Sequence, residues 1–468
     1  MRYRYRSEDE LKDSGVEWIG KIPKDWELKY LKYIIKNNDG GTWGEEQKYN
    51  NNDIIVIRST EVDENGKWRI DNPAIRNINE KEKQRCILLE GDLLITKSSG
   101  SEKHIGKTAI VTSEIENMKC VFSNFMQRIR VKSVNSSKLL FYIMNSNISK
   151  LQINYLSTTT TGLVNINSEL INRIKIPTTT LFEQEKIANF LDEKTSQFDL
   201  IISKKEELIK KLEEAKKSLI SEVVTGKVKV VKTDDGYELI KRSSEEMKYS
   251  GVEWLGEIPK DWEVKYFKHM FNFKKGLSIT KADLKESGVP CVSYGEIHSK
   301  YRFELNPSKQ NLQYVDEEYL STGTSSLLEY GDFIFCDTSE DLNGCGNFTY
   351  LNEYSKVFAG YHTIIARANK EINYRYMAYL FDSNDWRFQI RSKVSGIKVF
   401  SITQSILKTT TVIQPYLIEQ KHISDYLDIK CNGINHTIDK TKLQIEKLKE
   451  AKQSLISEAV TGKIEILD

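Results

Sequence analysis

The segment SGVEWIGKIPKDWE occupies residues 14–27, and SGVEWLGEIPKDWE occupies residues 250–263. The two are identical at 12 of 14 positions and stand 236 residues apart. The same offset relates LFEQEKIANFLD (181–192) to LIEQKHISDYLD (417–428), and EAKKSLISEVVTGK (214–227) to EAKQSLISEAVTGK (450–463). Each half of the chain therefore carries a shared opening segment, a weakly matching middle and a shared closing block. The chain is an internal duplication.

Length and composition are those of a protein with several ordered domains. At 468 residues the chain exceeds what one core needs, and 39% hydrophobic residues suffice for real cores. No apolar run is long enough for a membrane span, and no apolar stretch follows the basic N-terminus as in a secretory signal. The six cysteines lack metal-binding spacing and suit a reducing compartment, so we expect a cytoplasmic protein.

The closing blocks have the pattern of long helices. Residues 181–224 contain no Gly or Pro, and a narrow apolar stripe runs along a charged surface in both blocks, which is the coiled-coil pattern. Gly226 and Gly462 follow as C-terminal caps. The stripe consists of Ile202, Ile209, Leu212 and Leu219 in the first block and Ile438, Ile445, Leu448 and Leu455 in the second.

The middles have short β-rich runs, such as DLLIT and DFIFCD, broken by Gly, Asn and Ser. They predict two mixed α/β domains, so that the fold class is α+β with an internal pseudo-twofold repeat. The expected boundaries are 1–180 for a first domain, 181–227 for a central helix, 228–249 for a linker, 250–416 for a second domain and 417–463 for a C-terminal helix.

Searches for catalytic motifs give negative results. GSEKHIGKT (100–108) has five residues between its glycines where a phosphate-binding loop needs four. Asp25, Glu27 and Lys29 are crowded on one strand and cannot clamp a metal from two sides. The sequence also lacks an H-E-x-x-H zinc motif. We expect neither a catalytic residue nor a metal ligand in this chain.

Positive charge is concentrated in two stretches, although the net charge is only +2. Residues 117–182 carry eight Lys or Arg against one acid, and residues 354–418 carry nine against three. One basic region in each half is typical of a protein that contacts a polyanion at two places. Solvated faces that meet no phosphate are the alternative interpretation.

The repeated G-V-E-W-[IL]-G-x-I-P-K-D-W opening resembles the specificity (S) subunits of Type I restriction-modification systems. L-x-E-Q…I-x-x-[FY]-L-D and S-L-I-S-E-[VA]-V-T-G-K resemble the same family, as do the strand after Gly91 and the turn at Gly40. The resemblance implies two target recognition domains, each docking on half of a split DNA sequence, and two long antiparallel helices that fix their separation.

The resemblance also implies partners. Methylation (M) subunits, two of them, would bind the helices and carry S-adenosylmethionine, and restriction (R) subunits would use ATP and Mg. This chain would bind double-stranded DNA, hold no cofactor and have no enzymatic activity by itself. The duplication agrees, because segments that grip the same partner twice should be alike and segments that read different half-sites should differ. The shared Trp18, Trp26, Trp254 and Trp262 are accordingly expected to be packing residues.

Two pairs of equivalent loops are candidates for DNA contact. The loop 91–108 faces the loop 331–347, and the opposite polarity of Lys97 and Asp337 suits different bases, since Lys favours guanine and an acid accepts from cytosine. The segments 157–167 and 392–402 offer hydroxyls and charge for phosphates, although structural turns would look the same. The candidates are Lys97, Ser98, Ser99, His104, Lys107, Thr160, Asn165, Asp337, Thr338, Glu340, Arg391, Lys393 and Lys398.

Two other functions stay open on the sequence alone. The chain could be a fused nuclease or adenine methyltransferase with an active site outside these motifs, in which case purified chain would act without a partner. It could instead be a coiled-coil scaffold without a DNA role, in which case neutralising Lys97 or Lys393 would change no binding.

Overall fold

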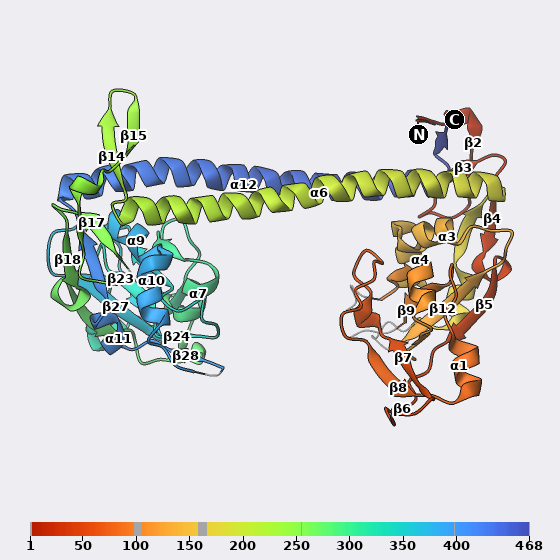
Figure 1. Ribbon diagram of the computed structural model, residues 1–468, viewed down its shortest axis with the longest axis horizontal. Helices are drawn as coiled ribbons and strands as arrows, with labels where there is room; N and C mark the ends of the chain where they lie inside the picture. The colour runs from red at the N-terminus through yellow and green to blue at the C-terminus, as the bar shows by residue number, and fades with distance from the viewer. Residues whose placement is uncertain (1, 98–104, 158–165, 254, 397, 468) are drawn as a thin grey trace. The chain divides into compact units, whose positions relative to one another are not determined.

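The computed structural model describes residues 2–97, 105–157, 166–253, 255–396 and 398–467. Its contacts divide the chain into a first unit, Met1–Glu206 with Lys442–Asp468, and a second unit, Glu207–Thr441. Both dividing points lie inside the two longest helices, α6 (Leu181–Val224) and α12 (Leu417–Val460) (Figure 1). The expected boundaries made each helix a separate domain, whereas each compact unit holds the start of one helix and the end of the other.

The first unit is built on a four-stranded antiparallel sheet. Its order is β10 (Thr108–Ile110), β9 (Leu93–Thr96), β12 (Met126–Val131) and β5 (Ile35–Gly40). All four residues of β9 are buried, as expected for a central apolar strand. A second sheet has the order β11 (Val121–Phe122), β7 (Asp53–Ile57), β8 (Ala74–Asn77) and β6 (Glu45–Glu46).

Among the described residues of this unit, five shorter helices and three strand pairs accompany the two sheets. The helices are α1 (Glu80–Cys86), α2 (Ser113–Asn117), α3 (Ser137–Asn145), α4 (Asn147–Ser157) and α5 (Ser168–Arg173). The pairs are β2 (Leu11–Asp13) with β3 (Lys21–Pro23), β4 (Glu27–Tyr30) with β13 (Lys175–Thr178), and β1 (Tyr3–Tyr5) with β30 (Ile464–Ile466). One core cluster joins α3 to Phe190 of α6 and Val460 of α12, so both long helices are anchored in the core of this unit.

The second unit repeats this plan with an aromatic core. Its five-stranded sheet has the order β19 (Phe271–Lys275), β27 (Thr363–Ala368), β23 (Phe333–Cys336), β25 (Phe348–Leu351) and β21 (Phe303–Leu305). A three-stranded sheet has the order β22 (Gln313–Val315), β20 (Val289–Val292) and β26 (Phe358–Ala359). Phe267, Phe381 and Trp386 are fully buried and contact one another edge to face or tilted.

The remaining elements of the second unit are short. Its helices are α7 (Tyr294–Ser299), α8 (Tyr319–Thr322), α9 (Tyr374–Asp382), α10 (Asn384–Arg391) and α11 (Gln404–Lys408). Its strand pairs are β14 (Val228–Thr233) with β15 (Gly236–Lys241), β16 (Met247–Tyr249) with β17 (Glu257–Pro259), β18 (Glu263–Tyr266) with β29 (Thr411–Gln414), and β24 (Thr338–Ser339) with β28 (Phe400–Ser401).

The first and last strands, β1 and β30, pair with each other in the same way as the two strands formed by the predicted linker. Residues 228–241 form the hairpin β14–β15, and β1 pairs with β30 in the same register shifted by 236 residues. The equivalent pairs are Tyr5–Ile464 with Lys241–Val228, Arg4–Glu465 with Ile240–Lys229, and Tyr3–Ile466 with Leu239–Val230. The duplication therefore continues through the ends of the chain.

The long helices match the sequence pattern closely. Both begin at the predicted residues, and every stripe residue is buried or half-buried. Within the first unit, Lys205 of α6 bonds Gln444 of α12, and the earlier Asp199 of α6 bonds the later Lys452 of α12. The two helices therefore run antiparallel there. Gly226 and Gly462 adopt φ of 76° and 70°, which confirms the glycine caps.

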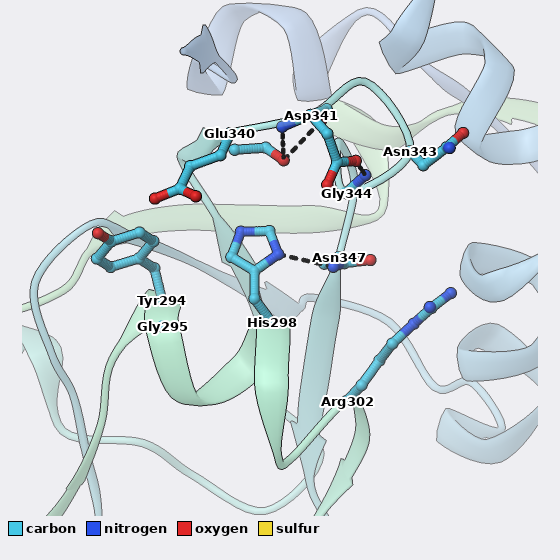
Figure 2. A pocket seen from close by; sticks show the side chains of 10 residues that line it. Tyr294, Gly295, His298, Arg302, Glu340, Asp341, Asn343, Gly344 and Asn347 are labelled. Carbon is cyan, nitrogen blue, oxygen red and sulfur yellow. Dashed lines mark hydrogen bonds between the residues drawn. The ribbon is translucent and has the colours of Figure 1, made fainter. Parts of the chain in front are cut away.

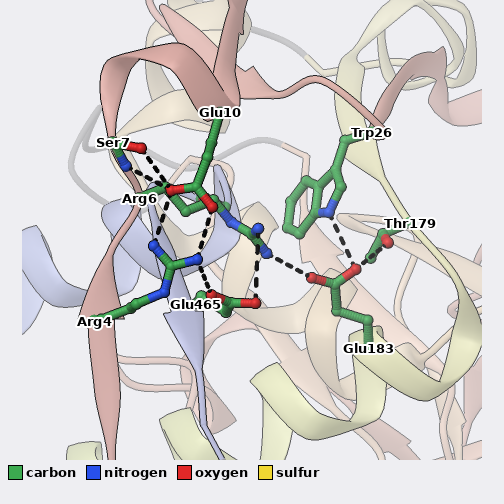
Figure 3. A network of polar contacts seen from close by, with 9 residues as sticks. Arg4, Arg6, Ser7, Glu10, Trp26, Thr179, Glu183 and Glu465 are labelled. Carbon is green, nitrogen blue, oxygen red and sulfur yellow. Dashed lines mark hydrogen bonds and ion pairs between the residues drawn. The ribbon is translucent and has the colours of Figure 1, made fainter.

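The shared segments meet at one place in each unit, which we call the helix-end joint. In the first unit, Trp26 is buried and its indole Nε1 donates to Glu183 Oε2 over 3.1 Å, at the start of α6. Arg6 donates to the same carboxylate (Figure 3). It also donates to the carbonyl of Gly462, beyond the end of α12. A Cβ at Gly462 would lie 2.6 Å from Pro23 Cγ, so only glycine fits.

The second unit has the same joint 236 residues later. Trp262 Nε1 donates to Glu419 Oε2 over 2.9 Å, and Arg242 donates to Glu419 Oε1 over 2.6 Å. Gly226 takes the place of Gly462 against Pro259 and Trp262. Trp26 and Trp262 are thus packing residues, as predicted. Trp18 also packs on the core, and Trp254 lies outside the described residues.

Candidate nucleic-acid interface

The two segments chosen from the sequence lie together in each unit. In the first unit, the backbone N–H of Ile166 donates to the Lys97 carbonyl over 3.0 Å. In the second, Ile402 donates to the Asp337 carbonyl over 2.7 Å, and β24 pairs with β28 beside it. Lys97 and Asp337 therefore occupy equivalent backbone positions, as the loop comparison predicts, and carry opposite charges there.

Lys97 directly follows β9, a central strand of the first unit's main sheet. Partial burial lowers the pKa of its ammonium, which has no ion-pair partner among the residues that the structure describes. A Cβ at Gly40 would lie 3.6 Å from Lys97 Nζ and 3.8 Å from Gln127 Oε1, which is ordinary van der Waals contact, so the ammonium lies close to the Gly40 backbone. An ammonium without an ion-pair partner can donate hydrogen bonds to an acceptor such as guanine O6 or N7.

Asp337 lies in a different chemical setting. Its carboxylate accepts a hydrogen bond from Thr338 Oγ1 at 2.7 Å and faces His362 Nδ1 at 3.0 Å. His362 has φ of 56°, an uncommon backbone conformation for a residue other than glycine, and its ring lies 5.2 Å from that of Tyr294. This surface presents acceptors and aromatic edges where the first unit presents an ammonium.

Sequence reasoning missed two residues next to these positions. Lys97 donates its backbone N–H to the Phe125 carbonyl, and Asp337 does the same to His362. Phe125 and His362 are thus equivalent, and the Phe125 side chain is 55% exposed. The only signal was that FSNFMQ and AGYHTI align through their strands, which requires the strand register.

Of the candidate DNA-contacting residues, five lie outside the described residues, and one of the others, Lys107, is buried. Lys107 is buried and its ammonium donates inward to the Val62 carbonyl, with its pKa lowered by burial. It is thus directed into the protein, unlike the expectation of a DNA contact. The candidates outside the described residues are Ser98, Ser99, His104, Thr160 and Asn165.

The remaining candidates of the second unit lie on or near its surface. Arg391 Nη2 donates to the Asn343 carbonyl over 3.0 Å, which ties it to the loop 337–347. Lys393 Nζ donates to Thr409 Oγ1 over 2.9 Å while staying exposed. Lys398 and Glu340 are exposed, and neither has an ion-pair partner among the described residues. Thr338 faces Asp337 and His362, as described above.

Part of the concentrated positive charge is used inside each unit. Arg130 pairs with the buried Asp92 over 2.7 Å, and Arg367 pairs with the equivalent Asp332 over 2.6 Å. Arg128 is buried and pairs with Asp39 over 2.6 Å. Arg130 and Arg367 hold the Gly-Asp turns before β9 and β23, and Arg128 is paired within the first unit. The count of basic residues therefore overstates the charge available to a polyanion.

In the parts of the chain that the structure describes, no group of three or more His, Cys, Asp or Glu could hold a metal. No helix among these residues has both the length and the apolar character that a membrane span requires. Glu27 and Lys29 form an exposed ion pair of 2.8 Å on β4, which makes this part of the Asp-Glu-Lys trio a surface feature.

Comparison with known proteins places this fold. The family model for the Type I restriction modification DNA specificity domain matches residues 23–213 and again 259–447. The MjaVIII specificity subunit of a Type I restriction enzyme from Methanocaldococcus jannaschii is 23% identical over 457 residues, covering 95% of this chain and 94% of the relative. The EcoKI specificity subunit of Escherichia coli is 26% identical over 212 residues, covering 45% and 44%.

Solved structures share the fold. A chain from a structure concerned with complex assembly and conformational transition of the type I R-M system has a TM-score of 0.70 at 13% identity, covering 94% of this chain and 99% of that one. The HsdS subunit of Thermoanaerobacter tengcongensis has a TM-score of 0.50 at 14% identity, covering 94% and 98%.

Proposed function

Because this chain belongs to the Type I restriction modification DNA specificity domain family, which matches it twice, we propose that it is the DNA-recognition subunit of a Type I restriction-modification complex. Each unit holds one recognition domain, and each domain reads one half of a bipartite DNA target. The two long helices join the domains and set the spacing of the half-sites.

The observation that carries the proposal is the pair Lys97 and Asp337. Their backbones are equivalent, they follow equivalent strands, and the helix-end joints of the two units use the same residue types. A donor in one domain and an acceptor in the other are suited to different bases, because guanine offers acceptors in the major groove and cytosine offers an amino group. We call the loop 337–347 the reading loop of the second domain. Lys393 and Lys398, beside this loop, would add phosphate contacts.

A partner that binds twice is supported by a duplicated apolar surface. Phe182 and Ile418 are equivalent, each is the second residue of a long helix, and their side chains are 76% and 62% exposed. An apolar side chain exposed at the same place in both halves is what a partner that binds the chain twice would require. We assign these two surfaces to two methylation subunits, with restriction subunits joining the full complex.

The chemistry would reside in those partners. We assign S-adenosylmethionine, ATP and Mg to the methylation and restriction subunits and not to this chain, as the resemblance to the family implies. The chain would be non-catalytic by itself and would act in the cytoplasm on double-stranded DNA. Methylation by the purified chain without a partner would contradict this division of labour.

The test is the adenine methylome of cells that express the chain with its methylation partner. A motif of two short specific sequences separated by unspecified bases is expected. A single continuous motif, or methylation without the partner, would contradict the proposal. Cells with the methylation partner alone provide the control, because they should show no such motif.

A further inference from the structure

The second unit contains a cavity beside its reading loop. Its volume is about 460 Å³, and its lining includes Tyr294, His298, Arg302, Glu340, Asn343 and Asn347 (Figure 2). One wall is the start of the second recognition domain's helix α7, and the opposite wall is the loop 339–347. The Asp337 surface lies directly before this loop.

A chain of hydrogen bonds runs behind the cavity. Arg387 Nη2 donates to Asn347 Oδ1, Asn347 Nδ2 contacts His298 Nδ1 at 2.7 Å, and His298 Nε2 contacts the Thr338 carbonyl at 2.9 Å. A guanidinium can only donate and a carbonyl can only accept. These two ends fix the direction of every bond, so that the Asn347 amide donates to a neutral imidazole protonated at Nε2.

We call this series of hydrogen bonds, from Arg387 through Asn347 and His298 to Thr338, the Arg387 relay. Arg387 is its unusual member. Its side chain is 3% exposed, and none of the described carboxylates forms an ion pair with it. Its Nε has no hydrogen-bond partner among the described residues, and burial lowers the pKa of the guanidinium to about 9. Burying a cation without a counter-ion is costly, which indicates a role beyond filling the core.

The relay differs from what the first unit has at the same places. Asn347 is equivalent to Lys107, because each accepts a hydrogen bond at its carbonyl from the last residue of the preceding strand. The Lys107 side chain donates to the Val62 carbonyl, whereas that of Asn347 contacts the His298 ring. Gln152 and Gln389 make matching bonds to Lys175 and Thr411. These bonds align α4 with α10 at an offset of 237, which makes the exposed Lys150 the counterpart of Arg387.

The relay holds the reading loop tightly on the imidazole. A Cβ at Gly344 would lie 3.2 Å from His298 Cε1 and 2.4 Å from Ser339 Oγ, so the loop rests on the ring at this glycine. Asp341 Oδ1 accepts from the Gly344 N–H over 2.7 Å and closes the turn. Glu340 is left with its carboxylate at the cavity and no ion-pair partner among the described residues. A lone carboxylate accepts hydrogen bonds and donates none.

We propose that this cavity is where the second domain recognises a cytosine of its half-site, with Glu340 accepting from the exocyclic amino group and Arg387 positioning the loop through Asn347 and His298. Cytosine N4 is the amino group that a Glu characteristically reads in the major groove. The inference rests on the proposed function, since it assigns the ligand chemistry of one recognition domain. Glu340 is, beside Asp337, a specificity-determining residue of this domain, and Arg387 is a positioning residue that touches no DNA.

The test uses the full chain in complex with its methylation partner. Methylation rates are measured on the cognate duplex and on duplexes that each carry one changed base pair in either half-site. Glu340→Ala should lower the preference for one C·G pair by about tenfold or more and leave every position of the other half-site unchanged. Glu340→Gln should keep part of the preference, because its amide oxygen still accepts.

Arg387→Met tests the positioning role. It should relax discrimination in the same half-site as Glu340→Ala, while Arg387→Lys, which can still donate to Asn347, should recover part of it. If Arg387→Met lowers the rate on all duplexes by one common factor, its role is structural and the positioning claim is wrong. Because Glu340 is exposed, its substitution does not endanger folding, so the reading claim can be tested even if Arg387→Met misfolds.

The two levels of the account fail in different ways. If wild-type complex discriminates at two half-sites but Glu340→Ala changes no position, or the two variants affect different halves, this inference is wrong and the proposed function stands. If the wild-type complex shows no bipartite preference, the proposed function itself is wrong.

Discussion

Trp26 and Glu183 are 157 residues apart in the chain, yet the indole Nε1 donates to the carboxylate over 3.1 Å. Trp262 and Glu419, also 157 residues apart, repeat the contact at 2.9 Å. Each contact ties the shared opening segment to the start of a long helix. The near-identity of the opening segments is thus explained by a joint that both units must make.

Removing the acceptor should destabilise each unit. Glu183→Ala leaves the buried Trp26 N–H without its partner, which costs about 1–3 kcal/mol. Glu419→Ala should cost at least as much, because the Glu419 side chain is 15% exposed against 27% for Glu183. Urea unfolding of the two variants and wild type measures the difference. Equal stability of all three proteins would show that the joint does not depend on this bond.

Acid should weaken the contact between the long helices in the first unit. Burial raises the pKa of Asp199, but hydrogen bonds from Lys452 and Lys67 lower it by more, so the net pKa is below its ordinary value. A depressed carboxyl pKa contributes stability above the unfolded-state pKa and loses it as pH falls through the folded-state pKa. Asp199→Asn should therefore lower the urea midpoint near about pH 7, and the gap to wild type should close toward about pH 3. A gap that widens in acid would contradict this sign.

The paired ends of the chain predict a tolerated circular permutation. Since β1 and β30 pair in the register of the hairpin β14–β15, joining Leu467 to Arg2 through an Asn-Gly turn should complete a second hairpin. The joined chain, opened between Asp234 and Asp235, should fold and direct the same methylation motif. An insoluble product, or a changed motif, would show that the two pairings are not interchangeable.

The duplicated apolar surface predicts how many methylation subunits bind. Phe182→Glu or Ile418→Glu alone should reduce the bound subunits from two to one, and the double variant should bind none, as measured by the mass of the purified complex. Leu208→Glu is the matched control, since Leu208 is 44% exposed on α6 but its equivalent is Gln444. If the control loses subunits equally, exposure alone explains the effect and the two surfaces are not docking sites.

The regular parts of this fold follow from local pattern. The helix starts at Leu181 and Leu417, the glycine caps and the apolar stripe were all predicted, because they depend on periodicity and on residues next to one another. The two units were not predicted as they are, since their dividing points inside α6 and α12 depend on contacts between residues hundreds of positions apart.

The candidate site was only partly predictable for the same reason. Lys97 and Asp337 were found because their loops align along the sequence. Lys107 is equally basic, but its contact to Val62, 45 residues away, buries it. Phe125 and His362 gain their positions from strand register, and the hydrogen bonds from Arg387 to Thr338 join α10, α7 and the loop 337–347, so neither leaves a local signature.

The central claim is that each unit reads its own half of the target, and the adenine methylomes of Lys97→Gln and Asp337→Asn test it most directly. Each variant is expressed with the methylation partner and compared with wild type. Lys97→Gln should make the motif degenerate in one half only, Asp337→Asn should make it degenerate in the other half only, and the spacer should be the same in all three. Loss of specificity in the same half for both variants, or in neither half, would contradict the account.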